Sequence, residues 1–175
     1  MSEYQAHISL GQSDDGVFVK IDGPATMALS AGFAALCEEC RRQFARPIYI
    51  DLSTCEWLDS TFAGCLVGQR VKTGASDGAG DGSGFTVIGS SEPCREVLTK
   101  MGLAPLLLSD APPPSPPPDA FAAVTAQTFS SEHVTETVID AHDHLAGIND
   151  TNREVFGRIA DAFRADLRRK RRSDA

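Results

Sequence analysis

The sequence predicts an α/β fold: a mixed sheet of about four to five strands with helices packed on it, followed by a C-terminal α-helical hairpin. Short apolar runs rich in β-branched residues alternate with amphipathic helical patterns over residues 1–110. A proline-rich stretch at residues 111–120 then interrupts the chain. Residues 121–175 carry two segments with apolar side chains at helical spacing and end in a basic tail. We therefore expect an α/β domain, a stiff linker and a helical extension.

The chain is expected to open with a β-hairpin and a helix. Residues 5–10 predict a first strand, and residues 17–22 predict a second with apolar side chains at alternate positions. An Asp-Gly pair at residues 15–16 favours a tight turn between them. Apolar residues at steps of three and four then predict a helix capped by Thr26 that runs to about Phe44.

The central segment is expected to fold as strand, loop and helix. Residues 48–52 are a buried-strand run of apolar residues. Asp59, Ser60 and Thr61 follow a short loop and have side chains that can accept N–H bonds at a helix start. Helical spacing behind them continues to Thr73. Ser60 is thereby predicted at the N-terminus of a helix, at the sheet edge where open α/β folds place functional groups.

The rest of the domain supplies further elements. Residues 74–84 contain five glycines and no phosphate-loop lysine, which predicts a flexible loop. Residues 85–88 predict another strand, and Glu92-Pro93 predicts the start of another helix. The leucines at 106–108 predict a last short edge strand.

Two helices are expected after the linker. The first is marked by Val134, Val138, Ala141, Leu145 and Ile148, and the second by Val155, Ile159, Phe163 and Leu167. Cap residues at 147–152, including a Thr151–Glu154 capping box, favour a hairpin over one continuous helix. Isolated helices of this size are marginal in water, so Val155, Ile159 and Phe163 are expected to cover an apolar face of the domain or of a second subunit.

Charge and composition restrict the function. The net charge is −8, with residues 153–175 near +4, so the rest of the chain argues against direct nucleic-acid binding. No apolar run is long enough to span a membrane and no signal pattern opens the chain, which predicts a cytoplasmic protein. The five cysteines are expected to be free thiols.

The motif D-L-S-x-C-x-x-L-D-S-T-x-x-G-x-L, from Asp51 to Leu66, resembles the signature of STAS domains, the family of bacterial anti-sigma factor antagonists. The resemblance covers about residues 5–108. Phe62 and Ala63 depart from the glycine and aliphatic residue that are usual after the Ser-Thr pair.

The resemblance implies a function for this motif. In the family, a serine kinase that is also the anti-sigma factor phosphorylates the serine after the aspartate, and here that residue is Ser60. A phosphatase would reverse the modification. The resemblance implies a partner-binding site at Asp59, Ser60, Thr61 and Phe62, although Phe62 also fits a core position. It implies no cofactor and no enzyme activity, and no nucleophile–base pair is identifiable in the sequence.

Other hypotheses remain open. The domain could instead be a scaffold or regulatory subunit of a signalling assembly or transporter ATPase, without phosphorylation. Cys37-x-x-Cys40 and His142-x-His144 resemble metal or redox pairs, but both are expected within helices, where His142 and His144 would point about 200° apart. The basic run 168–172 suits either a solubilising tail or contact with the acidic domain. The C-terminal helices could also form a homo-oligomer.

Overall fold

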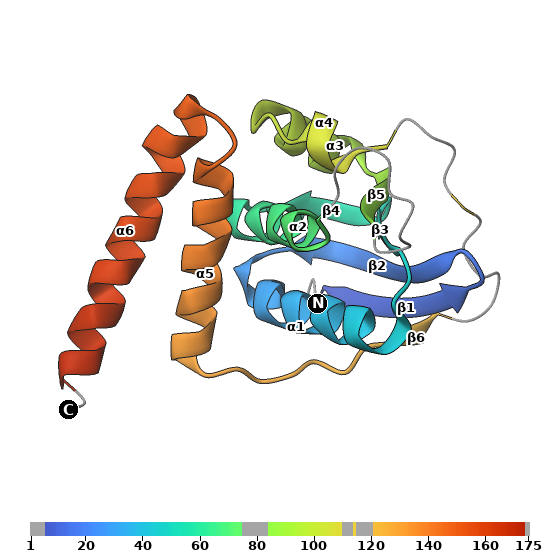
Figure 1. Cartoon of the computed structure of the whole chain (residues 1–175), viewed down its shortest axis with the longest axis horizontal. Helices are drawn as coiled ribbons and strands as arrows, with labels where there is room; N and C mark the ends of the chain where they lie inside the picture. Colours follow the sequence, from blue (N-terminus) through green and yellow to red (C-terminus); the bar gives the residue numbers. More distant parts are fainter. Residues whose placement is uncertain (1–5, 75–83, 110–113, 115–120, 174–175) are drawn as a thin grey trace, which may run out of the picture.

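The computed structural model describes residues 6–74, 84–109, 114 and 121–173 (Figure 1). The strands are β1 (His7–Ser13), β2 (Gly16–Ala25), β3 (Ile48–Leu52), β4 (Cys55–Leu58), β5 (Phe85–Ser90) and β6 (Ala122–Ala123). The helices are α1 (Met27–Phe44), α2 (Ser60–Lys72), α3 (Glu92–Lys100), α4 (Ala104–Leu107), α5 (Ser131–Ala146) and α6 (Asp150–Ser173). The predicted glycine-rich loop and proline-rich linker lie almost entirely outside the described residues.

Within the described chain, the strands form one mixed sheet in the order β5-β3-β2-β1-β6, and β4 pairs with the end of β2. The predicted hairpin is confirmed, because β1 and β2 are antiparallel with Ser13 opposite Gly16. The pairs β2–β3 and β3–β5 are parallel, as helical crossovers require. The predicted α/β class with a mixed sheet is therefore confirmed, and the short strands β4 and β6 were not predicted.

The core lies between the sheet and the two crossover helices. Alternate residues of β2 and β3, among them Val19, Ile21, Ile48 and Ile50, are fully or almost fully buried. Phe33 of α1 and Phe62 of α2 meet above them with ring centroids 4.8 Å apart. These contacts fix α2, and with it the start of α2, against the sheet.

The prediction of an edge strand at residues 106–108 is wrong. Most of this stretch belongs to α4, and Leu108 forms only one isolated parallel bridge, with Val87. Pro105 lies in the first turn of α4, where its fixed φ and missing N–H suit a helix start. Leu107 is buried, so the leucine run supplies core side chains from a helical turn.

The predicted C-terminal helical hairpin is confirmed. Figure 1 shows α5 lying beside α2 and α6 packed along the outer side of α5. Asn149 caps α6, because its Oδ1 accepts a bond of 2.8 Å from Asn152 N, so the cap is Asn149 and not the predicted Thr151–Glu154 box. None of the helices in the described part of the chain is long and apolar enough to cross a membrane.

The apolar face of α6 differs from the prediction at its first residue. Val155 is 51% exposed, whereas its neighbour Phe156 is buried, together with Ala160 and Leu167. Ile159 and Phe163 are half-buried. The hairpin thus docks on the domain as expected. Helix α5 makes most of the contact with the domain, and α6 covers α5.

Candidate functional site

Asp59 ties the N-termini of two helices together. Its Oδ1 accepts a hydrogen bond of 2.8 Å from Phe62 N at the start of α2. Its Oδ2 accepts one of 2.7 Å from Met27 N at the start of α1. The sequence predicted Thr26 as the cap of α1, but the Thr26 side chain makes no cap bond. One carboxylate therefore satisfies a backbone donor of each helix, and the negative charge suits the positive ends of both helix dipoles.

Ser60 is the first residue of α2, as the motif predicted, and it follows Leu58, the last residue of β4, by two positions. Its side chain is half-buried, and its Oγ lies 3.2 Å from Nε2 of His142 on α5. The other ring nitrogen, Nδ1, lies 2.8 Å from the backbone carbonyl of Val138. A carbonyl oxygen can only accept, so Nδ1 carries the proton, and in the neutral ring Nε2 is the acceptor. The Ser60 hydroxyl therefore donates to His142.

His142 is the residue of this site that the sequence analysis missed. It is 3% exposed, and its ring packs against Phe156 of α6 with centroids 5.8 Å apart. From the sequence, His142 was considered only as half of a possible metal pair and was assigned no contact with Ser60. A signal was present, because His142 lies four residues after Val138 and therefore on the apolar face of α5.

Thr61 and Phe62 occupy the core side of the helix start. Thr61 is 5% exposed and Phe62 is fully buried against Phe33. Their side chains are not available at the surface in this conformation. Of the four residues that the motif suggested for partner binding, Asp59 and Ser60 are only partly buried, and Phe62 holds α2 to the sheet.

Solved structures similar to this chain include two anti-sigma factor antagonists. An anti-sigma factor antagonist from Mycobacterium paratuberculosis is similar with a TM-score of 0.52 and 19% identity, over 63% of this chain and 90% of that chain. The chain has the STAS fold. The anti-sigma factor antagonist SpoIIAA in its unphosphorylated form is also similar, with a TM-score of 0.48 and 17% identity, over 58% of this chain and 85% of that one. No protein-family model and no curated protein matches the sequence.

A stripe of small residues on the STAS domain receives α5. Ser60, Gly64 and Gly68 follow one another at intervals of four along α2, and so lie on one face of the helix. A Cβ added at Gly64 would lie 2.2 Å from the backbone oxygen of Ala141, and one at Gly68 would lie 2.7 Å from the His144 ring. The first distance leaves no room for a side chain because the atom met belongs to the backbone, and the second would force the His144 ring to move. Glycine at these positions therefore permits the close approach of α5 to the STAS domain.

A small cavity of about 160 Å³ lies between α1, α2 and α5, and its lining includes Cys65, Gln69, His133, Asp140 and His144. Gln69 is buried and its Oε1 has no hydrogen-bond partner among the described residues. Burial, with smaller contributions from the carboxylates of Asp59 and Asp140, raises the pKa of the Cys65 thiol to about 12. Cys65 is therefore an unreactive thiol while α5 stays in place.

The cysteine and histidine pairs of the sequence do not form a metal centre in the described residues, where no group of three or more ligating side chains is found. Cys37 and Cys40 are free thiols within α1. Burial raises the pKa of both, which disfavours the thiolate that metal binding needs. His142 and His144 both lie against α2, although the angle between them predicted that they would not share a face: the first contacts Ser60 and the second covers Gly68.

Proposed function

We propose that this protein is a phosphorylation-switched binding module of the anti-sigma factor antagonist kind. Unphosphorylated, it binds an anti-sigma factor that is also a serine kinase, and phosphate on Ser60 releases that partner. The observation that carries the proposal is the position of Ser60: a hydroxyl at the first residue of α2, next to an aspartate that caps the helix, on a STAS fold.

The chemistry of this position suits a switch. Phosphate adds about 1.5 to 2 negative charges at neutral pH. The N-terminus of α2 tolerates that charge, because helix dipole and free N–H groups favour anions there. A partner surface pressed against the same point would meet the new charge beside the Asp59 carboxylate and would have to desolvate it. Phosphate can therefore weaken binding without unfolding the domain, and a phosphatase would restore the binding form.

The test is phosphate mapping with a serine kinase of the anti-sigma factor type from the same organism. Wild-type protein incubated with this kinase and ATP should gain one phosphate, on the peptide that contains Ser60, and Ser60→Ala should gain none. Ser131→Ala is the matched control, because Ser131 is also the first residue of an α-helix and is exposed. Phosphate on another residue, with Ser60→Ala still fully modified, would contradict the proposal.

A further inference from the structure

The hydroxyl on which the proposed switch depends is covered by the protein's own C-terminal hairpin. Ser60 Oγ donates to His142 Nε2 of α5 at 3.2 Å, across 82 residues of sequence. The backbone of Ala141, one residue earlier, lies directly over Gly64, one turn along α2 from Ser60. A kinase active site has to surround the serine that it modifies, and α5 occupies that space.

The second helix of the hairpin holds α5 in this position. Phe156 packs on the ring of His142, and Ala160 and Leu167 are buried farther along α6. Asn152 Nδ2 donates to the Met101 carbonyl at 3.0 Å and joins the start of α6 to the end of α3. The closed state is therefore supported at its centre and at the start of α6.

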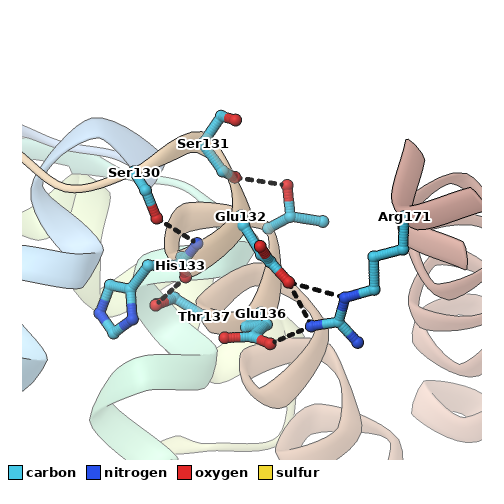
Figure 2. A network of polar contacts seen from close by, with 8 residues as sticks. Ser130, Ser131, Glu132, His133, Glu136, Thr137 and Arg171 are labelled. Atoms are coloured by element: carbon cyan, nitrogen blue, oxygen red, sulfur yellow. Dashed lines mark hydrogen bonds and ion pairs between the residues drawn. The ribbon is translucent and has the colours of Figure 1, made fainter. Parts of the chain in front are cut away.

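At the far end of the hairpin, ion pairs join α5 and α6. Figure 2 shows Arg171 of α6 reaching two glutamates on the first turns of α5. Its Nε donates to Glu132 at 2.6 Å and its Nη2 donates to Glu136 at 2.8 Å. Arg164 pairs with Asp143 farther along. These pairs are exposed, so they orient the two helices and add little to their stability.

We infer that the face of α2 that carries Ser60, Gly64 and Gly68 is a docking surface for which α5 competes, in the same chain, with the outside partner. This inference rests on the proposed function, since it describes the regulation of the same serine. While α5 is docked, Ser60 is closed to a kinase and the face is closed to an anti-sigma factor. Both need the hairpin to leave, and the hairpin can leave without disturbing the sheet.

Phosphate on Ser60 and docking of α5 exclude one another. The docked state uses the hydroxyl proton of Ser60 as a donor to His142, and a phosphate ester has no such proton. A phosphate group is also larger than a hydroxyl, and its oxygens would need several donors in the confined space under α5, where Nε2 could supply only one, and only by taking up a proton. Unpaired buried acceptors and an unpaired charge are costly. By linkage, phosphate weakens docking by the same factor by which docking weakens phosphorylation at equilibrium.

Amide hydrogen exchange of the full chain, followed by mass spectrometry, measures docking without kinase or partner. Gly64→Ala places a methyl group where the Ala141 carbonyl lies, and should make the amides of α5 and α6 exchange at least about tenfold faster, because an undocked hairpin frays. The amides of β2 and β3 should keep their protection. Gly157→Ala is the matched control on α6, where an added Cβ meets nothing within 4 Å, and should behave as wild type.

A second pair of variants tests the effect of charge. Ser60→Asp puts a carboxylate against His142, and should also release the hairpin. Asparagine is nearly the same size as aspartate, carries no charge and keeps an N–H donor for Nε2. In Ser60→Asn the amides of α5 should therefore stay protected to within about threefold of wild type. This pair remains decisive if Gly64→Ala destabilises the whole domain.

Three outcomes would overturn the inference. One is wild-type exchange of α5 and α6 in Ser60→Asp, since a charge would then fit under the docked helix. Another is equal release by Ser60→Asp and Ser60→Asn, which would make bulk the cause. The third is a Gly64→Ala protein with an intact sheet and a fully protected hairpin. Because none of these measurements includes a kinase, the inference can fail while Ser60 is a phosphate acceptor. The opposite case is visible in the Gly64→Ala protein: a released hairpin with no phosphate on Ser60 after incubation with kinase and ATP would contradict the proposed function alone.

Discussion

The two sides of α2 are built in different ways. Toward the sheet it presents Phe62 and Leu66, both fully buried among large apolar side chains. Toward α5 it presents a serine and two glycines, so that buried side chains of α5, among them Ala141 and Leu145, approach its backbone closely, and one hydroxyl–imidazole hydrogen bond joins the two helices. Large apolar side chains make an interface permanent, because every part of their surface returns to water when it opens. On the glycine side α2 itself contributes little apolar surface, and the buried apolar side chains belong to the hairpin, so we expect the structure to separate on this side.

The largest expected effect is on the sheet side. Phe62→Ala should lower the free energy of unfolding by about 3–5 kcal/mol, because it leaves a cavity between α1, α2 and the sheet. Urea unfolding followed by circular dichroism measures this. Phe121→Ala is the control, since Phe121 is 37% exposed and the same change should stay within about 0.5 kcal/mol. Equal effects of the two substitutions would contradict the placement of Phe62 in the core.

A smaller effect is expected on the α5 side, and it should be local. Leu145 is fully buried on α5, and Leu145→Ala should destabilise docking of the hairpin by about 2–4 kcal/mol. Hydrogen exchange should rise in α5 and α6, while β2 and β3 keep nearly wild-type protection. Val155→Ala, on the exposed side of α6, should change neither the exchange of the hairpin nor that of the sheet. Uniform loss of protection across the sheet would mean that the hairpin and the domain unfold as one unit.

The smallest effect is expected at the charged end of the hairpin. Arg171→Gln removes the contacts to Glu132 and Glu136, and should lower the melting temperature slightly in dilute buffer. Salt screens exposed pairs, so the difference from wild type should vanish near 1 M salt. Arg172→Gln makes the same charge change at a neighbouring exposed residue, for which no ion pair is found with the described residues, and is the control. A large effect of Arg171→Gln that persists at high salt would contradict the interpretation of this contact as a surface one.

The sequence was informative where a local pattern decides the structure. The strand at residues 48–52, the helix up to Phe44 and the helix start at Ser60 all follow from apolar periodicity and cap residues within a few positions. It was less informative for β4 and β6, which are four and two residues long and have no pattern of their own. The leucines at 106–108 were misinterpreted because three apolar residues in a row fit a strand and a buried helical turn equally well.

The contact of the candidate site with His142 could not be predicted, for a different reason. It joins residues 82 positions apart, and nothing near His142 in the sequence says which surface its helix will meet. The periodicity of residues 134–145 shows which face of α5 is buried. Gly64 and Gly68 show that something approaches α2 closely. Only the three-dimensional structure shows that these two faces belong together.

The short strand β6 has a consequence for any molecule that binds α2. Its two residues pair with β1, and only seven residues, 124–130, separate it from α5 (Figure 1). Such a segment reaches roughly 25 Å at about 3.3–3.6 Å per residue. If β6 stays paired, a released hairpin remains near its docking surface on α2, at an effective concentration on the order of millimolar. An outside protein therefore has to compete with a tethered hairpin whose local concentration does not fall when the sample is diluted. Its apparent affinity for the full chain should be lower than its affinity for α2 without the docked hairpin.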